Sequence, residues 1–479
     1  MTIAPSRVPA MSPAPKILAK PTPRNRYLFN PAQRRPILAA RPDTMEDIPM
    51  DTQIQSDAEA ELMEKARAVL PAGGFGNLAF DVVMREGLGG HIWDVSGNEY
   101  IDFLLGSGPM LIGHCHPDVM AAVNEQLPRG TTFFANNEHG ILLAEEIVKA
   151  VACADKVRFT SSGSEATFYA MRVARTHHKR DKILKFEGGF HGMSDYALMS
   201  MAPARPGNFP QSVPDTPGIP ANVRDNVLIA PFNDADTAAS LIRAHKDELA
   251  AVIVEPFQRL IKPQPGFLES LREVTLACNI ALIFDEVVTG FRLAYGGAQE
   301  YYGVVPDLCA LGKVIGGGFP LAAVAGRDEY MAHFNKAAVD QDAYMTQIGT
   351  LSGNPVAAAA GLATLKVLRQ PGAYERLFAN GRALMDGLSA LFAKTGTQAM
   401  VVGEPPLFDV FFTDKPIVDY RTMIQGDRDR LLRFNALIRA RGVFKGDSKF
   451  YVSLAHTDAD IAQSLDAFAS ALDALHAMA

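Results

Sequence analysis

Four segments of this sequence place residues that can do chemistry directly after a predicted apolar strand. The first is FTSSGSEA at residues 159–166, where hydroxyl side chains and a glycine stand between a strand and a helix. Free N–H groups at a helix N-terminus and serine hydroxyls can hold a phosphate, and Gly163 allows a close approach of the backbone. Because Ser162 is also an ordinary helix-capping residue, this segment alone leaves both roles open.

The second and third segments supply an aromatic ring and carboxylates. KFEGGFHG at residues 185–192 joins two glycines to Phe190, whose ring can stack on a ligand, and to His191, which alone is more typical of a packed loop histidine. ALIFDEVVTGFR at residues 281–292 ends an apolar strand with Asp285. A carboxylate there can pair with a cationic group in the crevice at the sheet edge. An isolated acid at that place is more often a solvated strand end.

The fourth segment, DLCALGKVIGGGFP at residues 307–320, places Lys313 between a strand and three glycines. Burial disfavours the charged form of an amine and makes it a nucleophile, although a surface-loop lysine is the alternative. The four segments together provide a phosphate cradle, an aromatic plate, a carboxylate and an amine. Pyridoxal phosphate requires these groups: a helix start for its phosphate, Phe190 against its ring, Asp285 to keep its nitrogen protonated and Lys313 for a Schiff base.

The elements that must position these segments follow from the alternation of strand and helix patterns between about residues 119 and 330. This alternation predicts a mainly parallel sheet with helices on both faces, and ligands of such sheets bind at the carboxyl ends of the strands. A helix is expected over residues 57–69, a hairpin over 91–103 around Ser96-Gly-Asn, and an Ala-rich helix over 355–368. The strand candidates are residues 156–160, 182–186, 227–230, 250–254, 280–284 and 308–311.

Composition excludes several classes of protein. The chain has 479 residues and a net charge of −7, which is unsuited to nucleic-acid binding. Four cysteines are too few for a disulfide scaffold in a chain of this length. No two of them form a CxxC pair, which argues against a zinc site, and no metal is expected. No apolar run reaches the roughly 18 to 20 residues of a membrane span. A cytoplasmic protein that binds no membrane is therefore expected.

The expected domain organisation has four parts. Residues 1–50 are Pro- and Arg-rich and are predicted to form a disordered tail, with an organelle-targeting or subunit-docking role as alternatives. Residues 51–115 would contribute to a small domain and to the active-site entrance. Residues 116–355 would form the large cofactor-binding domain, and residues 356–479 a connecting helix and the C-terminal small domain.

The sequence resembles the class III aminotransferases, which have the pyridoxal-phosphate fold type I. The resemblance runs from about residue 61 to 475 and is nearest to glutamate-1-semialdehyde 2,1-aminomutase and to β-amino-acid aminotransferases. It implies an α/β large domain with a mainly parallel seven-stranded sheet, and a smaller α+β domain formed by N- and C-terminal segments. The matching blocks are WDVSGNEYID (93–102), GHCHP (113–117), SGSEA (162–166), GFHG (189–192), DEVVTGFR (285–292), GKVIGGG (312–318) and GTLSGNP (349–355).

The resemblance also implies residue roles. Lys313 would form the Schiff base and carry a proton between substrate and cofactor, and Asp285 would pair with the pyridinium nitrogen. Thr350 would reach the phosphate of the neighbouring subunit, so that a homodimer with shared active sites is expected. The other cofactor-binding residues would be Ser162, Gly163 and Ser164 at the phosphate, Phe190 and Val287 on the two ring faces, and His191 and Glu255 nearby.

The sequence departs from the aminomutase pattern at the substrate. The aminomutase has an arginine shortly after its early Gly-Gly turn, whereas GGFGNLAF at residues 73–80 is followed by no arginine before Arg85. Arg259 could replace it as a carboxylate clamp, with a surface arginine as the alternative and Lys445 and Lys449 as lesser candidates. An apolar entrance, which favours an amine or a hydrophobic amino compound, is expected from Phe75, Leu78, Phe80 and Met110; alternatively these residues are core.

The leading expectation is a transaminase working by a ping-pong mechanism. It would move an amino group from an amine or an ω-, β- or hydrophobic amino acid donor to a keto-acid or aldehyde acceptor. The alternative is an isomerase of the glutamate-1-semialdehyde 2,1-aminomutase type. A decarboxylase on the same fold is a third possibility. A non-catalytic regulator is disfavoured, because it would need a DNA-binding motif that the Pro-rich N-terminus cannot build. A dinucleotide-binding oxidoreductase is also disfavoured, because no GxGxxG follows the first strand.

Overall fold

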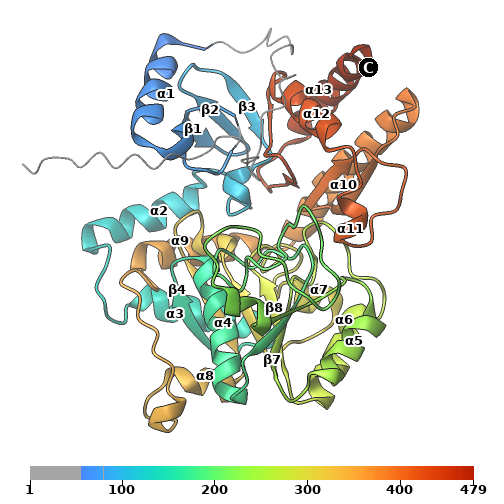
Figure 1. Ribbon diagram of the computed structural model, residues 1–479. Coiled ribbons are helices and arrows are strands. Elements are labelled where there is room, and N and C mark those ends of the chain that lie inside the picture. Colours follow the sequence, from blue (N-terminus) through green and yellow to red (C-terminus); the bar gives the residue numbers. More distant parts are fainter. Residues whose placement is uncertain (1–54, 79, 479) are drawn as a thin grey trace, which may run out of the picture. The chain divides into compact units, whose positions relative to one another are not determined.

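A seven-stranded sheet with the order β4-β10-β9-β8-β7-β5-β6 lies at the centre of the chain in this computed structural model, which describes residues 55–78 and 80–478 (Figure 1). The parallel pairs are β6–β5, β5–β7, β7–β8 and β8–β9. Only β10 runs antiparallel to its neighbours β4 and β9. The strands are β4 (Lys156–Thr160), β5 (Lys182–Phe186), β6 (Val227–Ala230), β7 (Leu249–Val254), β8 (Ala281–Glu286), β9 (Leu308–Leu311) and β10 (Ala322–Gly326).

Both faces of this sheet are covered, which explains why its central strands are apolar without interruption. Alternate residues such as Ile183, Ile253 and Ile283 pack against α4. The residues between them, such as Leu282 and Phe284, belong to the core shared with α3, α6 and α9. The helices that cover the sheet are α3 (Glu138–Ala150), α4 (Gly163–His178), α5 (Ala235–Ala244), α6 (Phe267–Ala277), α8 (Asp328–Met331) and α9 (Pro355–Leu368), while α2 (Pro117–Gln126) packs on α9.

The described chain also forms two smaller sheets. In the first, β13 (Val443–Phe444) pairs in parallel with β3 (Glu99–Asp102), so N- and C-terminal segments share one sheet. The order of this sheet is β1-β2-β3-β13, with β1 at Met84–Leu88 and β2 at His91–Asp94. The second sheet contains β11 (Met400–Glu404), β12 (Leu407–Phe411) and β14 (Phe450–Tyr451).

The remaining helices are α1 (Asp57–Val69), α7 (Ala298–Tyr302), α10 (Ala373–Thr395), α11 (Tyr420–Met423), α12 (Arg428–Arg439) and α13 (Asp458–Ala477).

The expected α/β architecture with a mainly parallel seven-stranded sheet is confirmed. The expected helix over residues 57–69 and the hairpin around Gly97 are also present. The strand candidates missed β10, and they ended β8 two residues early, at Phe284 instead of Glu286. The expected tail, residues 1–50, lies outside the described residues, and the four-part domain division stays a prediction.

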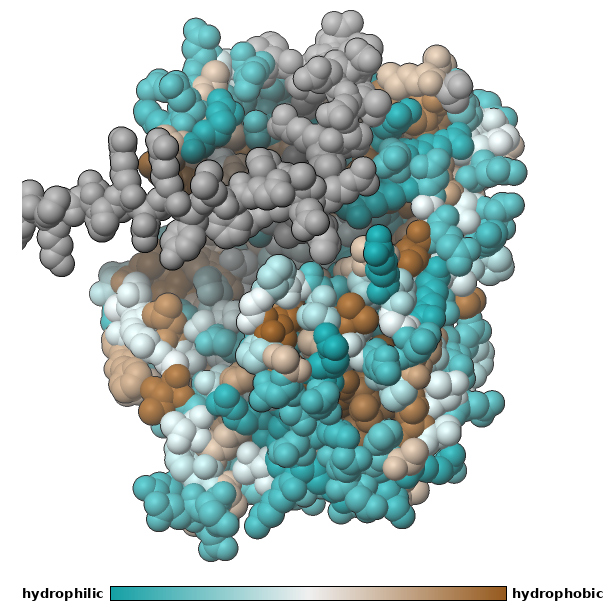
Figure 2. All heavy atoms as spheres, in the orientation of Figure 1, coloured by the Kyte–Doolittle hydropathy of each residue, from teal (hydrophilic) through white to brown (hydrophobic). Residues whose placement is uncertain are grey.

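The surface of the described chain is ordinary for a globular protein. On the face seen in Figure 2, hydrophilic side chains predominate over the lower half and apolar side chains are scattered between them. Among the described residues, no helix combines the length and apolar character that crossing a membrane would require.

Candidate active site

Lys313 lies where the carboxyl end of β9 turns into a short 3-10 segment, Lys313–Gly316. Its backbone has φ 47°, a left-handed value that non-glycine residues seldom adopt and that is a form of local strain. Burial lowers the pKa of the Lys313 amine, and the charges of Lys449 and Arg292 lower it further. Asp285 and Tyr451 act in the opposite direction but do not cancel this effect. Lys313 is therefore placed to act as a neutral amine more readily than an exposed lysine.

Asp285 is the next-to-last residue of β8, the strand beside β9, and its side chain is 5% exposed. One carboxylate oxygen lies 2.8 Å from Nδ1 of His191, and the other accepts the N–H of Val287 at 3.1 Å. His191 is 1% exposed, and its backbone carbonyl accepts the hydroxyl of Thr167 in α4 at 2.6 Å. Nε2 of His191 is buried and has no hydrogen-bond partner among the described residues. Asp285 and His191 thus form a buried polar pair at the sheet edge.

The start of α4 has free donors for an anion. Ser162 caps the helix: its hydroxyl accepts the N–H of Glu165 at 3.3 Å, and its own N–H donates to the Glu165 carboxylate at 2.9 Å. Gly163 and Ser164 come next, at helix positions whose N–H groups have no acceptor within the helix. The Ser164 hydroxyl accepts the N–H of Met193 at 3.2 Å, which leaves its own proton free to donate. Ser162 therefore acts as a capping residue, and Gly163 and Ser164 supply the donors.

Close packing brings these segments together around Val287. A Cβ added to Gly163 would lie 2.9 Å from the Val287 side chain, and one added to Gly312 would lie 3.2 Å from it. Gly192 has φ 87°, and its added Cβ would lie 2.6 Å from Cα of Ser164. The start of α4, the end of β8, the end of β9 and the His191 loop therefore meet, as the strand-end argument predicts.

Phe190 and Glu255 are joined by a hydrogen bond between the loop that carries His191 and the end of β7. Glu255 follows β7, is buried, and accepts the N–H of Phe190 at 2.8 Å. The Arg259 guanidinium lies 5.1 Å from the centroid of the Phe190 ring, and its Nε donates to the carbonyl of Gly188 at 3.1 Å. Arg259 is thus engaged with the loop that carries Phe190. Its expected role as a carboxylate clamp stays a prediction.

The other expected residues differ in their positions. Thr350 is exposed and lines a surface hollow with Phe133, Phe134 and Ile348. Phe75 is 86% exposed. Leu78 and Phe80 pack on the cluster of Ile92, Tyr100 and Phe444, and Met110 packs with Leu105 and Tyr451. Lys445 is buried in an ion pair with Asp409 at 2.9 Å. Lys449 lies near Lys313.

Sequence reasoning missed several residues that hold the site. Gln258 donates from Nε2 to the carbonyl of Glu187 at 2.8 Å, and Lys185, buried within β5, donates to the carbonyls of Ala197 and Met199 at 2.7 and 2.8 Å. Burial lowers the pKa of Lys185 to about 7. For Lys185, the one available signal was a lysine within an apolar strand, which indicates a buried amine. The sequence around Gln258 gave no signal.

Glu286 follows Asp285 but has a different role. It is buried and accepts the Thr289 hydroxyl at 3.1 Å and the N–H of Ala298 at the start of α7. Burial raises its pKa from 4.5 to about 7, so folding favours the protonated form. Its contribution to stability is therefore full below about pH 4.5 and is lost as the pH rises toward 7.

We expect Glu286→Gln to flatten the fall in unfolding free energy between pH 4.5 and 7, because glutamine does not titrate. Urea denaturation at several pH values measures this slope. An unchanged slope in the variant would show that another group carries the pH dependence.

The chemistry of the site fits pyridoxal phosphate. Free N–H donors and the Ser164 hydroxyl suit a phosphate, the Asp285 carboxylate suits a protonated ring nitrogen, and the Lys313 amine suits an aldehyde. The unpartnered Nε2 of His191 leaves one buried polar atom in the same group available to a ligand.

Comparisons with known proteins agree with this fit. The family model described as "Aminotransferase class-III" matches residues 75–472. The chain is similar to glutamate-1-semialdehyde 2,1-aminomutase of Methanosphaera stadtmanae, with 39% identity over 88% of this chain and 99% of the relative. It is also similar to glutamate-1-semialdehyde 2,1-aminomutase 2 of Brevibacillus brevis, with 42% identity over 81% of this chain and 90% of the relative.

Among solved structures, the chain is similar to an omega-transaminase from Sphaerobacter thermophilus, with a TM-score of 0.84 and 37% identity over 88% of this chain and 98% of the other. A beta-phenylalanine aminotransferase from Variovorax paradoxus has a TM-score of 0.78 and 30% identity over 88% of this chain and 94% of the other. These likenesses confirm the expected pyridoxal-phosphate fold type I.

Proposed function

The chain belongs to the class III aminotransferase family of pyridoxal-phosphate-dependent enzymes, and from that premise we propose that it is an isomerase of the 2,1-aminomutase type. Such an enzyme moves an amino group between neighbouring carbons of one substrate. The observation that carries this proposal is the identity of about 40% to aminomutases over most of the chain. We take glutamate 1-semialdehyde, from the names of those relatives, as the substrate to test.

The expectation of a transaminase with separate donor and acceptor was wrong. It gave most weight to the missing arginine after the Gly73-Gly turn and to an apolar entrance. The aminomutase relatives span nearly all of the chain, which one absent side chain does not outweigh. Phe75, expected at that entrance, is 86% exposed, and Leu78 and Phe80 pack on a core cluster; their place at an apolar entrance stays a prediction.

Pyridoxal phosphate, when bound, supplies a ring that withdraws electrons from the carbon bearing the substrate nitrogen. In the proposed site, Gly163 and Ser164 would hold the phosphate and Asp285 would face the ring nitrogen. Phe190 and Val287 would flank the ring, and Glu255 and His191 would fix the segments that carry these groups. Ser162 would shape the phosphate site through its cap on α4.

Lys313 is the proton carrier of this proposal. Its lowered pKa increases the share of neutral amine that can accept a proton from a substrate carbon, and the resulting ammonium can return the proton elsewhere. In an intramolecular shift, the inner carbon loses its nitrogen and one hydrogen, and the adjacent terminal carbon gains both. The carbonyl oxygen is exchanged the opposite way: the carbon–oxygen double bond at the terminal carbon breaks and one forms at the inner carbon. The substrate and product are isomers, so no second substrate is consumed.

We also propose that the enzyme acts in the cytoplasm as a homodimer in which Thr350 serves the partner's site. Exposed apolar side chains around the hollow at Thr350 support the dimer: Phe134 is 69% exposed and Ile348 70% exposed. Such a patch is typical of a covered surface. Light scattering of the holoenzyme is expected to give twice the chain mass of 51.7 kDa; a monomeric mass would contradict the proposal.

The function is tested by giving the purified holoenzyme glutamate 1-semialdehyde with no other amine or carbonyl compound. Shifting the amino group to the terminal carbon yields 5-aminolevulinate, which is measured by mass spectrometry. We expect many turnovers for each active site. Product limited to one equivalent, with turnover restored only by an added keto acid, would contradict an isomerase.

A further inference from the structure

The loop that carries Phe190 and His191 begins at Glu187, directly after β5. Glu187 is fixed by its backbone, because its N–H donates to the carbonyl of Ala230 at 3.0 Å and its own carbonyl accepts Nε2 of Gln258 at 2.8 Å. Its carboxylate is buried, with 3% of the side chain exposed. A buried carboxylate is costly unless a cation or hydrogen-bond donors stabilise it.

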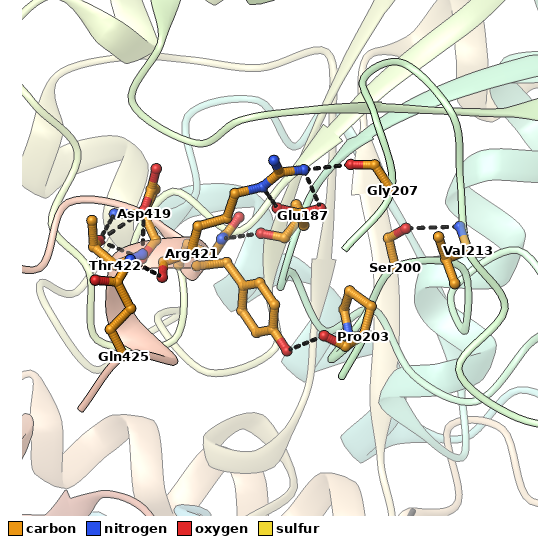
Figure 3. A network of polar contacts seen from close by, with 11 residues as sticks. Glu187, Ser200, Pro203, Gly207, Val213, Asp419, Arg421, Thr422 and Gln425 are labelled. Atoms are coloured by element: carbon orange, nitrogen blue, oxygen red, sulfur yellow. Dashed lines mark hydrogen bonds and ion pairs between the residues drawn. The ribbon is translucent and has the colours of Figure 1, made fainter. Parts of the chain in front are cut away.

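The cation comes from Arg421, 234 residues further along the chain in α11. Nε and Nη2 of Arg421 lie 2.7 and 3.1 Å from the two carboxylate oxygens of Glu187, which is bidentate pairing. Nη2 also donates to the carbonyl of Gly207 at 2.6 Å, and the guanidinium lies 4.3 Å from the Phe209 ring centroid. Figure 3 shows Arg421 reaching from α11 to Glu187 and Gly207.

The rest of α11 is fixed against the same loop. Asp419 and Thr422 form a capping box at its start (Figure 3). The Tyr420 hydroxyl donates to the carbonyl of Pro203 at 3.1 Å. Gly188 has φ 85°, and a Cβ there would lie 2.5 Å from the Tyr420 ring. The α11 segment therefore contacts Glu187 and Gly188, the residues that precede Phe190 and His191.

We propose that Arg421 is a positioning residue of the active site, which acts through Glu187 to fix the loop that holds Phe190 and His191. The inference rests on the proposed site at Lys313 and Asp285. His191 contacts the carboxylate of Asp285, the residue expected to face the ring nitrogen. A displacement of Glu187 and Gly188 would therefore move His191 relative to Asp285. A shift of about 1 Å in such a site can lower the rate about 100-fold.

The chemistry of Arg421 makes the proposal testable by conservative change. Lysine can pair with Glu187 but lacks the planar fork that binds both oxygens, Gly207 and the Phe209 face together. Arg421→Lys should therefore retain part of the function that Arg421→Gln loses. Arg428→Gln is the matched control, because Arg428 is an exposed arginine at the start of the neighbouring α12 and is not paired with Glu187.

Five quantities are measured on the holoenzymes: kcat and KM with glutamate 1-semialdehyde, the visible absorption of bound pyridoxal phosphate as a function of pH, the dissociation constant of the cofactor, and Tm. We expect Arg421→Gln to lower kcat by about 10- to 100-fold with a smaller change in KM. We also expect its absorbance titration to shift and its cofactor affinity to fall. Arg421→Lys should lie between it and wild type, and Arg428→Gln should match wild type.

Glu187→Gln combined with Arg421→Gln should cost no more than Arg421→Gln alone, because that variant already lacks the ion pair with Glu187. A lower Tm with unchanged kcat, absorbance titration and cofactor affinity would reduce Arg421 to a structural residue and overturn the proposal. Additive losses in the double variant would also overturn it. If wild type does not isomerise the substrate, the proposed function fails, but the absorbance and affinity measurements still decide the role of Arg421.

Discussion

Replacing Lys313 with alanine is expected to reduce isomerisation by about 10⁴-fold or more, because it removes both the amine that binds the cofactor and the proton carrier. The lysine-bound form of pyridoxal phosphate absorbs visible light, so the variant should also lose this band while retaining cofactor through Gly163, Ser164 and Asp285. Steady-state kinetics and an absorbance spectrum of the same preparation measure both effects.

The matched control is Lys366→Ala, which removes an exposed lysine on α9. It should leave rate and spectrum unchanged. Residual turnover of Lys313→Ala within about tenfold of wild type would exclude Lys313 as the proton carrier, since a general acid–base group contributes at least 10²-fold. Retention of the visible band would exclude it as the residue that binds the cofactor.

The large sheet could be predicted from sequence because its strands are short, apolar and bounded by polar or glycine-rich turns. Residues 156–160 and 308–311 coincide with β4 and β9 for this reason. The strand β10, AAVAG, escaped prediction because alanine and glycine have weak strand preference. Its extended form comes from pairing on both sides with β4 and β9, which is tertiary information.

The candidate site divides in the same way. The strand-end argument could place Asp285 and Lys313 at one edge of the sheet, because parallel strands β8 and β9 are neighbours. It could not show that His191 pairs with Asp285, since a loop residue has no fixed direction. The contact of Glu187 with Arg421 spans 234 residues and matches no motif, so only the folded chain shows it.

Asp285→Asn is expected to lower kcat by about 10²- to 10⁴-fold while the protein remains folded. Asparagine has nearly the same shape, and its carbonyl oxygen can still accept hydrogen bonds from His191 or the N–H of Val287. The change therefore isolates the negative charge, which the proposed role requires for holding a proton on the ring nitrogen. Asp285→Glu keeps the negative charge but displaces the carboxylate. It should retain more activity than Asp285→Asn only if the charge matters more than the position of the carboxylate.

Glu286 makes this test specific, because it is the next residue, equally buried, and also a carboxylate. Burial raises the pKa of Glu286 to about 7, so near neutral pH about half of this group is protonated and an amide removes only part of a negative charge. Its partners Thr289 and Ala298 belong to the segment leading into α7 and not to the group around Lys313. Glu286→Gln should thus change stability with kcat within about threefold of wild type. Equal losses of kcat in both variants would mean that a buried carboxylate is needed at this strand end only for folding, and Asp285 would lose its assigned role.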